Sequence, residues 1–501
     1  MLNRLTTKSI FLNWQTLFLL LVFFTIRFVS FSFHNHLIIQ GILVFSLLMF
    51  FGIVYFKNPD WAFFILIGEI FLGGSGNYLE FAGLSIRTLL ISIFLFLWTN
   101  HIIWKREFRK RFLINKYFTI ILIILYLFLM FASINGIING NNYKHIIQDL
   151  IPYLYLPLVF PTYHLLNKKN NYEYFIRLII VFIIGSALFS IFTFIMFSSG
   201  MVELQEPFYK WFRDAANGKI TNMGNGFFRI VLPEHLLIAP IILIISSLLM
   251  RDEHHHKMWR ILLFLSIIIL VLNLSRSFLL ALFVGLLILK YKHIASRWFI
   301  VSCTTIGLVV LIFTSFSIVS SNGKTLGWEL FGVRLASLAS PKIETSSATR
   351  MIILPSILEQ ISENPMLGNG LGSSFTYLNP NSNDYTTTGQ YDWGYLEMLA
   401  ELGVIGSIIL LAIYIFSTTR IINKIKFVSD WHDFYVGSLA AIIAMLVINI
   451  TTPALFHTFG IIFIVLILSL ALKPANIFEK LVTTLYRIFN RIKKRSTNMQ
   501  T

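Results

Sequence analysis

Apolar residues fill most of the chain in runs of about 15 to 23 residues, and a helix needs about 20 to cross a bilayer, so several of these runs are short. Turns or charged stretches separate each run from the next. Because runs of this length exceed what the core of a soluble domain can cover, they predict an all-α polytopic membrane protein with about fourteen transmembrane helices. The predicted spans are residues 13–32, 37–56, 61–79, 86–103, 117–134, 146–163, 175–197, 234–250, 259–274, 276–290, 298–319, 394–416, 434–451 and 456–472.

The polar segments divide the chain into four parts. Residues 1–319 hold the first eleven predicted helices, residues 394–472 hold helices 12 to 14, and residues 473–501 form a basic tail. The first run lacks a cleavable signal pattern and is expected to remain as the first span. Between the two membrane blocks, residues 320–393 form one large polar loop. Chemistry on dissolved or anionic groups is expected in this loop.

Lysine and arginine concentrate in alternate loops, and short cytoplasmic loops retain such residues. The pattern predicts that both termini and the tail are cytoplasmic and that residues 320–393 are extracytoplasmic. This arrangement accounts for the net charge of +17, which orients the protein and attracts anionic lipid headgroups rather than nucleic acid. The basic connections contain Lys57, Lys105, Arg106, Arg109, Lys110, Arg111, Lys116, Lys168, Lys169, Arg177, Arg251, Lys257, Arg260, Lys290, Lys292, Arg297, Arg420, Lys424 and Lys426.

Composition narrows the class of protein further. Hydrophobic residues make up 56% of the chain and charged residues 13%, which excludes a soluble globular protein. The one cysteine, Cys303, excludes a disulfide within the chain and a CxxC metal or redox site.

Arg276 interrupts an apolar sequence that runs from Ile261 to Leu289, at an outward turn between two predicted spans. An arginine at the bilayer centre costs about 2.5 to 3.5 kcal/mol on insertion scales, and less near the interface. Two interpretations remain open. Arg276 either reaches the outer headgroups or a carboxylate, or it faces a cavity and binds phosphate.

Arg350 precedes or opens a segment with apolar residues at positions 354, 357, 358 and 361. This spacing predicts an amphipathic helix on the outer membrane face, ended by Pro365. The planar guanidinium of Arg350 is suited to bidentate phosphate contact, although a solvent-exposed arginine is an equally good interpretation.

Three features follow this helix. Gly368, Gly370 and Gly372 predict a tight turn whose backbone amides approach an anion, or merely a turn. Asp392 is a candidate base for a sugar hydroxyl, or the N-cap of the predicted span at 394–416. Glu397 lies about one turn further along that span, where it orients an arginine or a sugar hydroxyl, or faces solvent.

In this order, the motifs resemble the O-antigen ligase and O-antigen polymerase superfamily. The resemblance rests on Ser275-Arg276-Ser277, on Arg350, on the run from Pro365 to Gly372, and on residues 395–406. The ligase branch has a His-Asn pair where this chain has Asp392-Trp393. This departure favours the polymerase branch, where acidic residues occur.

The resemblance implies a fold similar to C-type membrane glycosyltransferases and a metal-independent glycosyl transfer without cofactor. It further implies polymerisation of lipid-linked oligosaccharide repeat units from undecaprenyl pyrophosphate, at the outer face of the bacterial cytoplasmic membrane. Membrane lipids and a chain-length regulator protein are the other expected partners. The predicted catalytic residues are Arg276, Arg350 and Asp392, and the predicted substrate-binding residues are Arg229, Arg334, Gly368, Gly370, Gly372 and Glu397.

Two other functions compete with this one. Transfer of glycan to lipid A-core would make the protein a ligase. A flippase for lipid-linked oligosaccharides would also have about fourteen spans, but it should place charges at mid-membrane and show two related halves. The charged residues of this chain gather on one face instead, and no internal repeat is visible.

Overall fold

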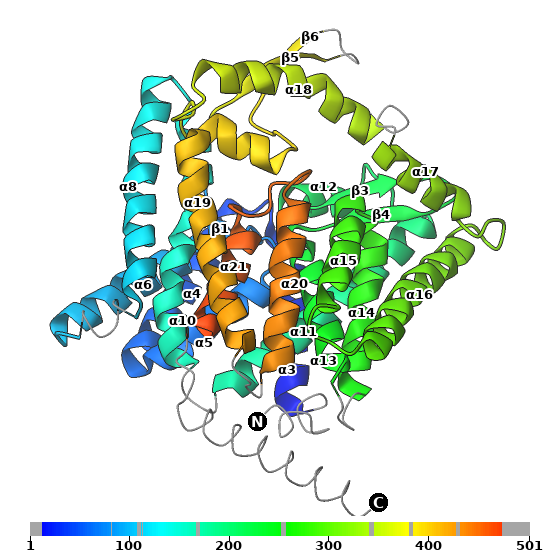
Figure 1. Cartoon of the computed structure of the whole chain (residues 1–501), viewed down its shortest axis with the longest axis horizontal. Coiled ribbons are helices and arrows are strands. Elements are labelled where there is room, and N and C mark those ends of the chain that lie inside the picture. Colours follow the sequence, from blue (N-terminus) through cyan, green and yellow to red (C-terminus); the bar gives the residue numbers. More distant parts are fainter. Residues whose placement is uncertain are drawn as a thin grey trace, which may run out of the picture.

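Long helices that run between two opposite ends of the molecule make up most of the structure (Figure 1). The computed structural model describes residues 13–81, 83–107, 112, 114–166, 171–251, 257–339, 345–379, 384–426 and 431–472. The basic tail predicted at 473–501 lies outside these residues. The described part of the chain is an all-α polytopic membrane protein with three small β-hairpins.

The first half of the described chain consists mainly of helices. They are α3 (Trp14–Phe33), α4 (Leu37–Lys57), α5 (Pro59–Leu72), α6 (Ile86–Trp104), α8 (Lys116–Ile138), α9 (Tyr143–Leu150), the 3-10 helix η1 (Ile151–Leu158), α10 (Val159–Leu165) and α11 (Asn171–Ser198). Local sequence explains several starts. The Asn58 side chain accepts a bond from the Asp60 amide, and the Asn115 side chain accepts two at the start of α8.

The second half contains the helices that surround the large polar loop. They are α12 (Pro207–Asp214), the 3-10 helix η2 (Pro233–Leu237), α13 (Ile238–Leu249), α14 (Lys257–Asn273), α15 (Arg276–Leu289), α16 (Ala295–Ser320), α17 (Trp328–Ala339), α18 (Thr345–Glu363), α19 (Gly394–Lys426), α20 (His432–Ile448) and α21 (Thr458–Ala471). The hairpins are β1 (Glu80–Phe81) with β2 (Leu84–Ser85), β3 (Lys219–Asn222) with β4 (Phe228–Val231), and β5 (Phe375–Asn379) with β6 (Asp384–Thr388).

Each of the fourteen predicted spans overlaps helix in the structure. Seven of the described helices are long and apolar enough to cross a membrane, and shorter apolar helices include α15, α20 and α21. Two predictions of span geometry are wrong. The helix expected at 61–79 ends at Leu72, before a glycine turn. The segment at 146–163 is broken into α9, η1 and α10, because Pro152 and Pro157 lack the amide that a continuous α-helix needs.

The elements of the polar loop gather at one end of the molecule, together with the β3–β4 hairpin (Figure 1). We call this the polar-loop end. The helix ends beside the connections from α13 to α14, from α15 to α16 and from α19 to α20 lie at the opposite end (Figure 1). Basic residues beside those connections include Arg251, Lys292 and Lys424. The alternation of basic loops therefore corresponds to two distinct ends of the helix assembly.

Helix α18 confirms the predicted helix before Pro365, but its buried stripe differs from the predicted one. Ile353 and Ile357 are 3% and 0% exposed, whereas Leu358 is 49% exposed. Arg350 lies inside the helix, in its second turn, rather than before it. The stripe shifts because α18 packs on the start of α19 and on β5, which select a different face than hydrophobicity alone does.

Small residues let the helices of the second half approach closely. A Cβ on Gly437 of α20 would lie 2.8 Å from the Cα of Ile244 on α13, and one on Gly285 of α15 would lie 2.3 Å from Leu243. Close approach of this kind is how helices associate in lipid, where hydrophobic burial gives little driving force.

Two buried ion pairs join the helices of the first half to their neighbours. Arg27 on α3 contacts Glu234 on η2 at 3.3 Å, and Arg87 on α6 contacts Glu69 on α5 at 2.7 Å. The Arg87 side chain also donates to the carbonyl of Gly74 at 2.6 Å. Removing one member of such a pair leaves a buried charge uncompensated, which typically costs about 3 to 5 kcal/mol.

We expect cysteine labelling to separate the two ends of the molecule. In a Cys303→Ser background, Lys324→Cys should react with a membrane-impermeant maleimide on intact cells, because Lys324 follows α16 at the polar-loop end. Lys292→Cys lies at the opposite end and should react only after permeabilisation. Both lysines are exposed in the structure. Labelling of both positions on intact cells would overturn the orientation.

Candidate functional site

The predicted site residues come from elements that lie at the polar-loop end (Figure 1). Arg276 is the first residue of α15, Arg350 lies on α18, and Asp392 stands two residues before α19. The three residues are far apart in the sequence, and folding brings the elements that carry them to the same end of the molecule.

A network of contacts fixes the junction between α18 and α19. The Trp393 indole donates to the carbonyl oxygen of Arg350 at 3.3 Å, and the Tyr391 hydroxyl donates to Gln360 at 3.0 Å. The Ser373 hydroxyl lies 2.6 Å from that of Tyr391, which is 1% exposed. Arg350 and the residues around Asp392 are therefore held next to each other, as the prediction of a shared site requires.

Asp392 does not occupy the N-cap position of α19. The first backbone bond of the helix runs from the Glu397 amide to the carbonyl of Trp393 at 2.9 Å, so Trp393 stands at the cap. Asp392 has a φ of +54°, unlike the extended backbone of an N-cap residue, and its side chain is exposed. The capping interpretation of Asp392 is therefore wrong, and its chemical role stays a prediction.

Arg229 donates a hydrogen bond to the turn that precedes Arg276. Its Nε donates to the carbonyl of Asn273 at 2.7 Å, and the Asn273 amide lies 3.2 Å from Nδ1 of His235. Leu274 in this turn has a φ of +44°. The contact gives Arg229 a clear role in positioning the start of α15, and its predicted contact with substrate stays untested.

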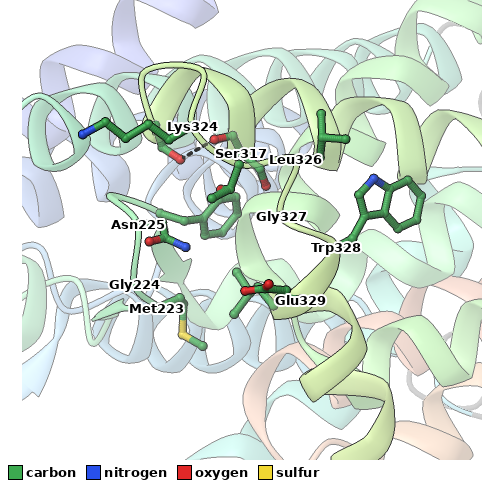
Figure 2. Close-up of a pocket in the computed structure, with 13 residues that line it drawn as sticks. Met223, Gly224, Asn225, Ser317, Lys324, Leu326, Gly327, Trp328 and Glu329 are labelled. Carbon is green, nitrogen blue, oxygen red and sulfur yellow. Dashed lines mark hydrogen bonds between the residues drawn. The ribbon is translucent and has the colours of Figure 1, made fainter.

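Arg334 is 4% exposed and its Nη2 lies 3.0 Å from the sulfur of Met223. This burial argues against a direct contact with a diffusing glycan. A pocket of about 290 Å³ lies nearby, between the β3–β4 turn and the start of α17 (Figure 2). Lys324 and Glu329 are among its lining residues, and the Lys324 ammonium points away from the others (Figure 2). None of the predicted catalytic residues lines this pocket.

The segment with Gly368, Gly370 and Gly372, which we call the glycine run, packs as a wedge between α8, α9 and α19. The amide of Gly370 donates to the Glu401 carbonyl at 3.1 Å, and the amide of Gly372 donates to the carboxylates of Asp149 at 3.0 Å and Glu401 at 3.3 Å. The amide of Gly368 bonds within the turn, to the carbonyl of Asn364. These amides are committed to acceptors of the chain itself, so the geometry argues against the predicted anion contact.

A cluster of ionisable side chains lies beside this wedge, and sequence reasoning missed most of it. Oε1 of Glu397 lies 3.2 Å from Nε2 of His457, and Glu401 and Asp149 share the amide of Gly372. Glu397 is 5% exposed, so the interpretation that it faces solvent is wrong, whereas its predicted contact with an arginine or a sugar hydroxyl stays a prediction. We call Asp149, Glu397, Glu401 and His457 the carboxylate cluster.

The start of α19 is bent toward this cluster. Gly403 has φ 62° and ψ −172°, which separates a first segment, Gly394 to Leu402, from the rest of the helix. Glu397 and Glu401 are one turn apart on that segment, and both are at most 5% exposed. Two glutamates four residues apart in an apolar helix were a visible signal in the sequence, but their partners were not.

The environment of His457 favours its charged form. Partial burial lowers the pKa of the imidazole, whereas the hydrogen bond with Glu397 and the negative charges of Glu397 and Asp149 raise it, and the net shift of the pKa is upward. His457 itself precedes α21, at the N-cap position.

Comparison with known protein families finds a similarity in the central part of this chain. A family model described as O-antigen ligase matches residues 261–411, from α14 into α19. The matched segment contains Arg276, Arg350, the glycine run, Asp392 and Glu397. No curated protein matches the chain.

We expect Gly370→Ala to destabilise the protein more than Gly140→Ala. Both glycines have positive φ, so both substitutions introduce backbone strain of about 1 to 2 kcal/mol. A Cβ on Gly370 would also lie 2.2 Å from the backbone of Gly136, whereas nothing lies within 4 Å of one on Gly140. Overpacking adds about 1 to 3 kcal/mol. Thermal unfolding midpoints in detergent measure the difference, and equal midpoints would contradict the wedge.

Proposed function

Because residues 261–411 match a family model described as O-antigen ligase, we propose that the chain belongs to the O-antigen polymerase and ligase superfamily and polymerises lipid-linked oligosaccharide repeat units. The growing glycan leaves undecaprenyl pyrophosphate and joins an incoming lipid-linked unit at the outer face of the cytoplasmic membrane. The observation that carries this proposal is the junction of α18 and α19, where the Trp393 indole donates to the backbone carbonyl of Arg350 and so keeps this residue near the start of α19.

The reaction needs stabilisation of a leaving group and a base. The bond between the sugar C1 and the pyrophosphate oxygen breaks with its electron pair on oxygen, and C1 bonds the acceptor hydroxyl oxygen, which loses a proton. Two guanidinium groups that are positioned before the reaction stabilise the charge that the leaving pyrophosphate gains. In this proposal Arg276 and Arg350 supply them, and Arg276 adds to the anion preference of the N-terminus of α15.

The residues at the junction favour polymerisation over ligation. The chain has Asp392-Trp393 where the ligase branch has a His-Asn pair. Transfer to a second lipid-linked unit requires only that both substrates reach the same outer surface, and the predicted residues lie at that end of the helices.

The buried charges of the first half bear on the flippase alternative. The Arg27–Glu234 and Arg87–Glu69 pairs lie among the helices, but each arginine is at most 3% exposed and is engaged with a carboxylate. Such closed pairs stabilise helix packing, whereas a transport path requires charges that face a cavity. The structure therefore gives the flippase alternative no support from these charges.

Reconstitution with lipid-linked repeat units tests the function. Purified protein in liposomes should convert the units into a ladder of longer lipid-linked glycans. Transfer of the glycan to lipid A-core, with no ladder, would support the ligase instead. Transport of intact units across the bilayer without a new glycosidic bond would support the flippase.

We expect Arg350→Ala to reduce ladder formation by about 100- to 1,000-fold, as the loss of one electrostatic stabiliser does elsewhere. Arg350→Lys should recover little activity, because lysine lacks the bidentate fork. The same substitutions at Arg276 should behave alike. Arg213→Ala is the matched control, since Arg213 is an exposed arginine paired with Asp214 on α12. Full activity in Arg276→Ala and Arg350→Ala would refute this assignment.

A further inference from the structure

The carboxylate cluster contains a pair whose arrangement is that of an oriented base. The Glu397 side chain is 7% exposed and the His457 side chain is 47% exposed, with Oε1 and Nε2 3.2 Å apart. One partner is thus buried and held, while the other reaches the surface at the polar-loop end. The matched family segment contains Glu397 but ends before His457, so the family comparison says nothing of the contact between them.

The contact selects one tautomer of the neutral imidazole. A carboxylate accepts a proton but does not donate one, so Nε2 carries the hydrogen and donates it to Glu397. The lone pair of the neutral ring is then on Nδ1. A buried carboxylate that fixes the tautomer of an accessible histidine is the arrangement that general bases use in acyl transfer.

The neighbours of the pair are acidic. Asp149 on α9 and Glu401 on α19 lie behind Glu397, and Asp392 lies before it on the approach to α19. The buried phenol of Tyr153 in η1 lies close to the same carboxylates. The negative charges of Glu397 and Asp149 stabilise an imidazolium once His457 has accepted a proton.

We propose that His457 takes the proton from the acceptor hydroxyl during glycosyl transfer and that Glu397 is its positioning residue. The inference rests on the proposed function. The acceptor oxygen bonds C1 of the donor sugar, its proton moves to Nδ1 of His457, and the electron pair of the broken C1–O bond leaves with pyrophosphate. His457 returns the proton to water between turnovers.

This assignment gives Asp392 a different role from the predicted one. Asp392 is exposed, whereas His457 is oriented by a buried carboxylate. In this inference Asp392 contacts sugar hydroxyls, and its replacement by asparagine keeps a polar group of the same size there. If His457 is the base, His457→Gln should lose more activity than Asp392→Asn. If Asp392 is the base, Asp392→Asn should lose more.

The first measurement is the rate of ladder formation per folded protein in liposomes. We expect His457→Gln to lose about 100- to 10,000-fold, the usual contribution of a general base, and Asp392→Asn to lose less than 10-fold. His432→Gln is the matched control, because His432 also contacts a carboxylate, Asp433, at 3.2 Å but lies at the opposite end of the molecule. The inference would be overturned if His457→Gln kept the wild-type rate, or if Asp392→Asn lost more activity than His457→Gln.

The second measurement is the pH dependence of the rate of ladder formation. Loss of a residue with a merely structural role would not shift it. The neutral ring is the active form, so the rate should fall as the pH drops through a pKa above 6.5, the ordinary value for histidine. Glu397→Gln removes the charge that raises this pKa, so the acid limb should shift to lower pH. An acid limb that stays in place in Glu397→Gln would overturn the positioning role.

Failure of the proposed function gives a different result. If the wild-type protein transfers glycan to lipid A-core instead, polymerisation is refuted, and the same variants and pH profile apply to that transfer, where His457 must still be required. If the wild-type protein forms no glycosidic bond with either acceptor, both the function and the base are refuted.

Discussion

The packing of the glycine run against α8 and α19 is the constraint on which the arrangement of the polar-loop end depends. A Cβ on Gly368 would lie 2.4 Å from the carbonyl oxygen of Glu401, and one on Gly370 would lie 2.2 Å from the backbone of Gly136. Backbones that approach this closely leave no room for a side chain. The wedge thereby ties the end of α18 to α8 and to the bend at Gly403, so the first segment of α19 has one orientation.

That orientation separates positive from negative groups at the polar-loop end. The first segment of α19 turns Glu397 and Glu401 toward Asp149 and His457, while the Trp393 bond at the start of α19 holds the backbone of Arg350. A glycosyl transfer from pyrophosphate needs both kinds of group, cations for the departing phosphate and a base for the incoming hydroxyl. Because the same short segment carries or contacts both sets, a change in its tilt would alter both halves of the site.

The two buried arginines inside the helix assembly, Arg27 and Arg87, are paired with groups of the chain itself. Arg27 and Arg87 are buried, and each contacts a carboxylate and backbone carbonyls, because an uncompensated charge among apolar helices is expensive. Arg276 lies instead at the end of its helix, where water and headgroups lower that cost. The position of an arginine along the bilayer normal thus distinguishes the cations that hold helices together from Arg276, which we propose contacts the substrate.

Much of the fold follows from the sequence alone, since hydrophobic length and loop charge are properties of contiguous residues. All fourteen predicted spans contain helix, and Arg276, Arg350 and Asp392 stand out because each is a charged residue near the end of an apolar run. The partners of these residues do not follow from local sequence. His457 stands 60 positions after Glu397, and Asp149 stands 223 positions before Gly372, so no periodicity relates them. Local sequence likewise predicts a turn at the glycines, but the acceptors that occupy their amides come from helices whose placement depends on the packing of the whole chain.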